Sequence, residues 1–68
     1  MNKNILTKRE KEVFSLLIKN YTTKDIAEKL NISEKTVRNH ISNTIQKLGV
    51  RDRTSAVVEL IKLGNITL

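Results

Sequence analysis

The residues of this sequence best suited to chemistry lie between positions 34 and 48, and their chemistry is hydrogen bonding rather than catalysis. If this segment is a helix, turning about 100° per residue, its core-facing side carries a narrow apolar stripe. The stripe consists of Val37, Ile41, Ile45 and Leu48. The opposite side carries Lys35, Asn39, Ser42, Asn43 and Gln46, with Arg38 and His40 on its flanks. Asn and Gln pair with adenine, and Arg and Lys reach guanine, so this side suits the major groove of DNA.

The first half of this helix should supply the contacts to bases, because the N-terminal half of a recognition helix usually enters the groove most deeply. The expected base-reading residues are Arg38, Asn39, Ser42 and Asn43. The alternative is a polar side that is simply solvated, as most helices have. Such sides usually contain acids, whereas this one has only Glu34, at its first position, where the helix dipole favours a negative charge.

Phosphate contacts are expected around the edge of the reading side. Thr22, Thr23 and Lys24 lie at the start of an expected helix, where free N–H groups suit phosphate. The other candidates are Lys35, Thr36, His40, Lys47, Arg51 and Arg53. His40 has a second interpretation, as a half-buried histidine bonded to a backbone carbonyl, and both interpretations can hold together. Metal binding is not expected, because the sequence contains one His and no Cys.

The composition favours one small domain with an anionic partner. The 68 residues predict a single domain over 1–68, and a chain this short buries only about 60% of the surface that its unfolded form exposes. The net charge is +6, and residues 35–53 hold five basic side chains against one acid. A basic block on a small domain suggests nucleic acid. The alternative is a solvated basic surface without a partner.

Several classes of protein are excluded by the residues present. The longest apolar run, 16–18, is far below the roughly 18 residues that span a membrane. No signal-type apolar region follows Met1, and these two absences together indicate the cytoplasm. Seven acids, one His and no Cys give no nucleophile–base pair. We therefore expect no enzyme, and no cofactor or small-molecule ligand is evident.

The elements that position these side chains are predicted to be helices at about 8–20, 24–30, 34–48 and 53–63. Proline is absent, no segment alternates as a strand would, and four capping signals separate the apolar stripes. These signals are a capping box at 7–10, a threonine cap at 22 or 23, Ser33, and Asp52. Asn31 and Gly49 suit left-handed helix ends. The inward side of the last helix is expected to hold Ala56, Val57, Leu60 and Leu63. A short helix, a tight turn and a longer capped helix form a helix-turn-helix, within an all-α fold.

Glu10 is an exception to the apolar pattern, since it falls on the inward side of the first helix. A buried carboxylate needs hydrogen-bonding partners. The capping box supplies one of them. We expect a basic residue of the third helix, such as Lys47, to supply another.

Four linked motifs also resemble those of LuxR-type (GerE-type) helix-turn-helix DNA-binding domains. They are LTKREKEV at 6–13, KDIA at 24–27, ISEKTVRNHI at 32–41 and KLGV at 47–50. The resemblance covers about residues 6–63 and implies a four-helix domain that binds double-stranded DNA as a homodimer through its last helix. It implies base contacts at Arg38, Asn39 and Ser42. It also implies phosphate contacts near Thr23, Lys24, Thr36 and His40.

The resemblance extends to the biological role. The chain is similar to stand-alone members of the family that regulate sporulation, which suggests control of spore-coat genes. The alternatives are an effector domain excised from a two-component response regulator, and an interaction module that has lost DNA binding. A transcription regulator also needs a further contact, expected with RNA polymerase, and the sequence does not identify its surface.

The homodimer is expected to follow a twofold axis, with two third helices in successive major grooves about 10 base pairs apart. The expected seam consists of Thr54, Val58, Ile61 and Lys62. The alternative for Val58 is an isolated apolar residue on the surface, which is common in proteins.

Overall fold

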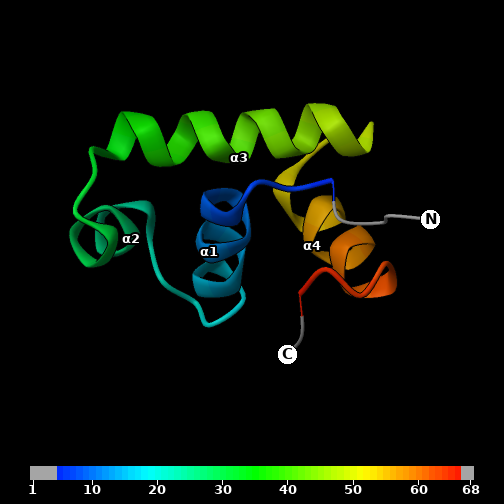
Figure 1. Ribbon diagram of the computed structural model, residues 1–68, viewed down its shortest axis with the longest axis horizontal. Helices are drawn as coiled ribbons and strands as arrows, with labels where there is room; N and C mark the ends of the chain where they lie inside the picture. The colour runs from blue at the N-terminus through cyan, green and yellow to red at the C-terminus, as the bar shows by residue number, and fades with distance from the viewer. Residues whose placement is uncertain (1–4, 67–68) are drawn as a thin grey trace.

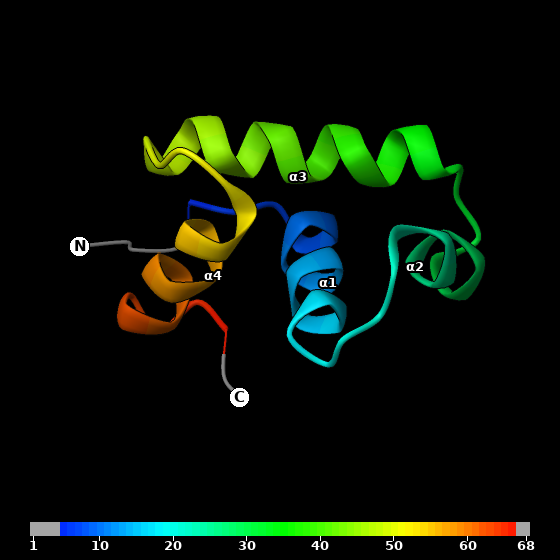
Figure 2. The same ribbon diagram turned by 180° about the vertical axis from the view of Figure 1, so that it is seen from behind.

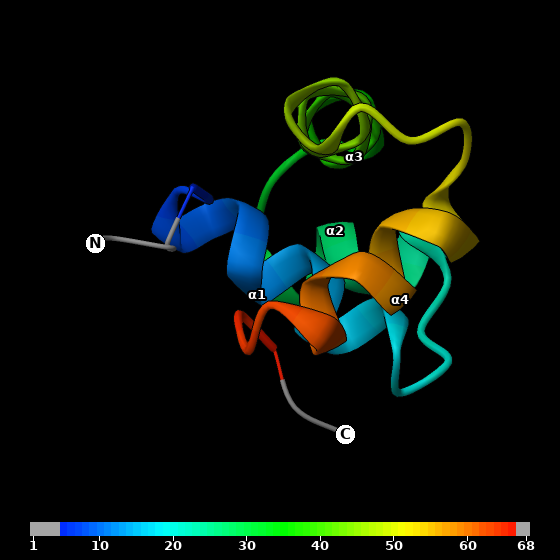
Figure 3. The same ribbon diagram turned by 90° about the vertical axis from the view of Figure 1, so that its right-hand side faces the viewer.

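The computed structural model describes residues 5–66, and every regular element in that range is an α-helix. The helices are α1 (Lys8–Leu17), α2 (Thr23–Leu30), α3 (Glu34–Leu48) and α4 (Arg53–Lys62). Figure 1 shows α3 lying across the other three, and the view from behind in Figure 2 shows the same arrangement. In the end-on view of Figure 3, α3 again lies above the layer formed by α1, α2 and α4. This confirms the predicted all-α fold of four helices.

Two of the predicted helix ends were placed too late in the sequence. α1 stops at Leu17 rather than near residue 20, because the chain turns through Asn20 with a positive φ of 71°. The Tyr21 N–H then donates to the Leu16 carbonyl at 3.2 Å and closes the helix end. α4 stops at Lys62 rather than 63, and Gly64 follows in the left-handed conformation. The start of α2 is one residue earlier than predicted, because Thr22 is its cap.

The core lies where α1 meets the other helices. Phe14 and Val13 of α1 are fully buried, as are Ile26 of α2, Val37 of α3 and Leu60 of α4. Chain segments outside the helices complete it, since a residue before α1 and one after α4 are also buried. These two are Leu6 and Ile66. α3 packs against each of the other three helices, so it is both the top layer of the fold and part of its core.

The buried residues of α3 and of the segment at the end of α4 differ slightly from those predicted. In α3 the buried residues are Val37, Ile41 and Thr44, whereas Ile45 and Leu48 are only half-buried. The Thr44 hydroxyl donates to the His40 carbonyl at 2.8 Å, so its burial leaves no polar group unsatisfied. In α4, Leu63 was expected to face inward but is 38% exposed. Its helix has already ended at Lys62, so the periodicity no longer applies.

The predicted capping box of α1 is present and is joined to α3 by a charged contact. Glu10 accepts the Thr7 N–H at 2.9 Å, and the Glu10 N–H donates to the Thr7 hydroxyl at 3.1 Å. The same carboxylate oxygen of Glu10 accepts from the Lys47 ammonium at 2.7 Å. Lys47 also donates to the carbonyl of Ile5 at 3.4 Å. The predicted partner of Glu10 is therefore confirmed.

This environment acts on the ionisation of Glu10 in two opposing directions. Only 3% of Glu10 is exposed, and such burial by itself raises the pKa of a carboxyl group. The hydrogen bonds from Lys47 and from the Thr7 backbone lower the pKa, as do the charges of Lys47 and His40. The lowering effects are the larger in sum, so the pKa of Glu10 falls below its ordinary value of 4.5. Glu10 is therefore ionised at neutral pH.

We expect Glu10→Gln to lower the free energy of unfolding at neutral pH by about 1–3 kcal/mol, because Lys47 loses its charged acceptor. Because the pKa of Glu10 is lower in the folded state, its contribution to stability is complete above pH 4.5 and is lost as the pH falls through the folded-state value. Urea unfolding followed by circular dichroism, from neutral to acidic pH, measures both effects. The difference in the free energy of unfolding between wild type and variant should become smaller at acidic pH.

Glu12→Gln is the matched control, because it lies on the same helix and removes an exposed ion pair, Arg9–Glu12 at 3.1 Å. Exposed pairs of this kind contribute roughly 0–1 kcal/mol. Equal losses for the two variants would show that the Glu10–Lys47 contact has no special role in stability.

Candidate nucleic-acid interface

The turn between α2 and α3 is built by local backbone requirements. α2 ends at Asn31, which adopts the left-handed conformation with φ 58° and ψ 47°. The Ile32 N–H then donates to the Ala27 carbonyl at 2.9 Å, and the half-buried Ile32 side chain packs against the core. Ser33 caps α3 by accepting the Thr36 N–H at 3.0 Å. These contacts fix the direction in which α3 leaves α2.

The predicted reading side of α3 is brought together on one exposed surface. The four base-reading candidates are all exposed, and so are Lys35 and Gln46. The exposed candidates are Arg38, Asn39, Ser42 and Asn43. The buried residues of α3 lie on the same helical turns, on the side that faces the other helices. Packing of these buried residues against the other helices therefore holds the exposed side of α3 in place.

One contact on this surface was missed by the sequence reasoning. The Arg38 guanidinium lies 3.4 Å from the Glu34 carboxylate one turn earlier, and both side chains are largely exposed. The spacing of four residues between an acid and a base on a helix is the signal that could have identified it. The positive end of the helix dipole therefore favours the Glu34 carboxylate. The same carboxylate also pairs with Arg38 on the surface of the helix.

The start of α2 offers fewer free N–H groups than expected. Thr22 and Asp25 form a second capping box, in which the Asp25 N–H donates to the Thr22 hydroxyl at 3.1 Å. The Asp25 carboxylate in turn accepts the Thr22 N–H at 3.2 Å. The first helical N–H groups, of Thr23 and Lys24, have no acceptor within the helix. Lys24 is exposed and Thr23 is half-buried, so both can reach a phosphate.

The connection between α3 and α4 carries a second basic edge. Arg51 and Arg53 are both exposed and flank Asp52, whose carboxylate caps α4 by accepting the Ser55 N–H at 2.8 Å. This hydrogen bond lowers the pKa of Asp52. Arg53 lines a shallow surface groove together with Arg38 and Ser42 of α3. One expected phosphate contact is thus adjacent to two expected base readers.

The remaining phosphate candidates on α3 are engaged in internal contacts to different degrees. The Lys47 ammonium is occupied by Glu10, so Lys47 differs from the other candidates in having a structural role. The Thr36 hydroxyl lies 2.9 Å from that of Ser33, at the start of the helix. His40 is half-buried and near enough to Glu10 to lower the pKa of that carboxyl. Lys35 is exposed on the first turn.

The expected dimer seam is partly accessible on α4. Val58 is 48% exposed, and Thr54 and Lys62 are also exposed. Ile61 is half-buried and packs against the core, so only part of its side chain is available to a partner. Leu63, which the sequence placed in the core, is instead exposed beyond the end of this helix.

The exposed polar side of α3, the tight turn before it and the basic edges beside it define a helix-turn-helix DNA-binding domain. Residues 4–60 match the family model of "Bacterial regulatory proteins, luxR family". The chain belongs to this luxR family of bacterial regulatory proteins, and it is a DNA-binding transcription regulator. The resemblance noted in the sequence is therefore confirmed.

The comparisons with individual proteins agree with this assignment. The chain is 63% identical over 67 residues to the spore germination protein GerE of Bacillus subtilis (strain 168), covering 98% of this chain and 90% of GerE. It is similar to a solved structure of the transcription factor GerE with a TM-score of 0.90 and 63% identity, covering 91% of this chain and 92% of that one. It is also 57% identical to the transcriptional regulatory protein DegU of Brevibacillus brevis, covering 90% of this chain but 26% of DegU.

Among residues 5–66, no helix is long and apolar enough to cross a membrane. The same range contains no group of three or more His, Cys, Asp or Glu side chains that could hold a metal ion.

The left-handed residue of the turn provides a direct test of how α3 is positioned. We expect Asn31→Ala to lower the free energy of unfolding by about 1–2 kcal/mol, because a side chain with a Cβ and no local hydrogen bond is disfavoured there. Asn31→Gly should have a much smaller effect, since glycine adopts this conformation freely. Thermal unfolding of the two variants checks this pair, and equal destabilisation would show that backbone conformation is not the cause.

Proposed function

We propose that this regulator binds double-stranded DNA with the first half of α3 in the major groove. The observation that carries the proposal is the outward side of α3, where exposed amide, hydroxyl and basic groups occur without an acid beyond the first turn. We assign base reading to Arg38, Asn39, Ser42 and Asn43. These groups match the donors and acceptors on base edges in the major groove.

We assign phosphate binding to the edges of the same surface. On one side the phosphate-binding residues lie at the start of α2 and are Thr22, Thr23 and Lys24. On α3 and the following connection they are Lys35, Thr36, His40, Arg51 and Arg53. Lys47 can join them only if its ammonium leaves Glu10. Contacts of this kind fix the position of the protein on the duplex without reading sequence.

We further propose that two copies bind one site through α4. The support is a row of exposed residues on that helix, of which Val58 is the apolar member. A seam this small gives weak association in free solution, so DNA contributes much of the energy that assembles the dimer. Thr54 and Lys62 would border Val58, and the exposed part of Ile61 would complete the contact.

The proposed biological role is control of sporulation genes, including genes of the spore coat. It is supported by the 63% identity to the spore germination protein GerE, which the chain matches over 90% of that protein's length. The second candidate is an effector domain of a response regulator. It is favoured by the likeness to DegU, of which the chain covers 26%. In either case we propose that activation of a promoter uses a contact with RNA polymerase, whereas repression is equally compatible with this domain. We also propose a cytoplasmic location, because bacterial DNA lies there.

Binding to duplex DNA of random sequence at two salt concentrations tests the electrostatic part of the proposal. Affinity should fall steeply as salt rises, because phosphate contacts release counterions. Lys24→Ala should weaken binding to all sequences alike and reduce the salt slope by about 1. Arg38→Ala should instead change which sequences are preferred, as measured by selection from a randomised duplex pool.

Footprinting on genomic fragments would supply the natural site for the same measurements. Indistinguishable behaviour of the two alanine variants would contradict the division between base readers and phosphate contacts. Weak binding by the wild type at both salt concentrations would instead favour an interaction module that has lost DNA binding.

The dimer proposal is tested by Val58→Glu on a duplex that carries two inverted half-sites. We expect cooperative binding to be lost while affinity for a single half-site is little changed, because Val58 is exposed and its replacement leaves the core intact. Lys19→Gln is the matched control, since it changes the net charge by the same amount at an exposed position outside α4. Gel-shift titrations measure both, and intact cooperativity in Val58→Glu would place the seam elsewhere.

A further inference from the structure

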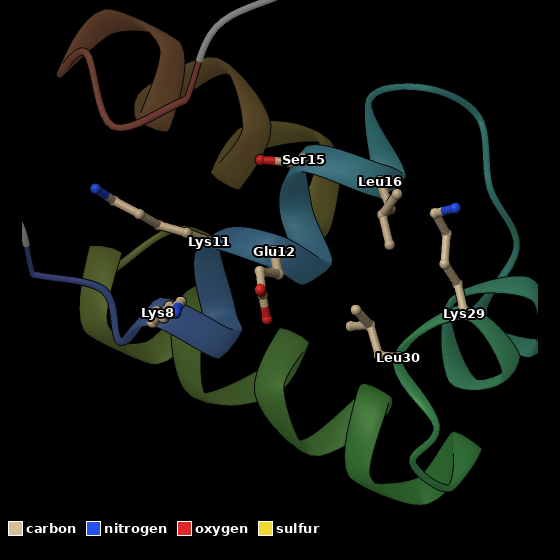
Figure 4. A pocket seen from close by; sticks show the side chains of 7 residues that line it. All are labelled: Lys8, Lys11, Glu12, Ser15, Leu16, Lys29 and Leu30. Carbon is tan, nitrogen blue, oxygen red and sulfur yellow. The ribbon is translucent and has the colours of Figure 1, made fainter.

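A groove separate from the proposed DNA surface lies between α1 and α2. Its volume is about 390 Å³, and Figure 4 shows it from close by. All of the residues that line it come from these two helices, and none comes from α3 or α4. None of them belongs to the groups assigned above to bases, phosphates or the dimer seam. The groove is therefore a surface that the proposed function does not yet use.

The groove has an apolar floor. In Figure 4 the side chains of Leu16 and Leu30 point toward each other across the space between the helices. Leu16 is nearly buried and Leu30 half-buried, so each still presents some apolar surface. Ser15, beside Leu16, is the small neutral residue of the lining. A single apolar side chain of a partner could cover both leucines.

The rim of the groove is strongly basic. Lys8 and Lys11 contribute from α1, and Lys29 contributes from α2. In Figure 4, Lys29 stands on one flank of the groove, whereas Lys11 lies on α1 beyond Glu12 and its ammonium is directed away from the two leucines. The ion pairs within residues 5–66 do not include any of these lysines.

The single acid of the lining does not neutralise this rim, because Glu12 already pairs with Arg9 at 3.1 Å. The Lys29 ammonium lies 6.0 Å from the centre of the Tyr21 ring, so its charge is attracted to an aromatic face rather than neutralised by an acid. The lining therefore combines three lysines with a small apolar floor. A complementary ligand combines carboxylates with one apolar side chain.

We propose that this groove binds an acidic segment of RNA polymerase that inserts one apolar side chain between Leu16 and Leu30. The inference rests on the proposed function, in which activation uses a polymerase contact that had not been located. A DNA backbone suits the groove less well, because phosphates gain nothing from an apolar floor and would leave it exposed. Complementary charge at the rim would steer the encounter, and burial of the apolar side chain would hold it.

The small size of the groove is consistent with such a contact. A surface of this size binds weakly by itself, since stable complexes usually bury about 1,600 Å² in total. A regulator bound beside a promoter meets polymerase at a high effective concentration, because both are held on one DNA molecule. A weak contact is sufficient under those conditions.

Site-specific cross-linking tests the proposal, because the chain contains no cysteine and a single one can be introduced at will. Ser15→Cys places a photoreactive label in the groove, and Gln46→Cys places one on the exposed side of α3, at a position not assigned to bases or phosphates. Each labelled protein is irradiated with purified RNA polymerase holoenzyme and a promoter fragment identified by footprinting. We expect the Ser15 label to join a polymerase segment rich in Asp and Glu, identified by mass spectrometry, and the Gln46 label to join DNA.

A charge reversal on the rim tests the proposal quantitatively, through the yield of the Ser15 cross-link. Lys11→Glu should reduce the Ser15 cross-link to polymerase by about tenfold, because it places a like charge against the acidic segment. Lys19→Glu is the matched control, with the same charge change at an exposed position outside the groove. It should leave the cross-link unchanged, and both variants should bind DNA alike.

Three results would overturn the assignment of the groove while leaving DNA binding intact. They are a Ser15 label that joins DNA, a Ser15 label that joins no polymerase subunit, and equal effects of Lys11→Glu and Lys19→Glu. A Gln46 label that does not reach DNA would overturn the proposed function itself. The two failures are therefore distinguished within one experiment.

Discussion

The contact between Glu10 and Lys47 connects the start of α1, which lies in the core layer, to the end of α3, which carries the exposed polar side. One carboxylate closes the first turn of α1 through Thr7 and also accepts the ammonium of Lys47 near the end of α3. Its near-complete burial would disfavour the charge, but the hydrogen bonds outweigh that cost, and the pKa of Glu10 is lowered. Glu10 is buried whereas 37% of the Lys47 side chain is exposed. A buried carboxylate needs such a partner, so the contact favours the arrangement in which the end of α3 lies beside the start of α1.

In α3, the residues that pack into the core and the residues of the exposed polar side are different ones. Val37, Ile41 and Thr44 are buried on turns of α3 whose other side is exposed and polar. The groups proposed to meet base edges are thus carried on a helix that the core already holds. Lys47 illustrates the limit of this arrangement. A lysine engaged by a buried carboxylate can reach a phosphate only by giving up that contact, and the fold would lose part of its stability.

Much of this architecture was readable in the sequence because it depends on local rules. Ser33 and Gly49 bound α3 where its capping signals predict, and the partner of Glu10 followed from the need to satisfy a buried charge. The errors occur where packing or the exact end of a helix decides. Thr44 lies on the buried side of α3, where its hydroxyl is satisfied by the His40 carbonyl, and Leu63 is exposed because α4 ends before it. The predicted seam and the groove between α1 and α2 depend on surfaces that only the packed structure defines.

The thinness of the core has a functional consequence. In a domain of 68 residues, each helix has one side in the core and another at the surface, so each can present a different surface. α3 presents polar groups suited to bases, α4 presents Val58, and α1 with α2 presents a basic rim around Leu16 and Leu30. Neither the surface of α4 nor the groove between α1 and α2 is large enough for tight binding alone. Under the proposed function, contacts at both surfaces would gain strength when DNA holds the partners together, so occupancy of the DNA site would be the step on which they depend.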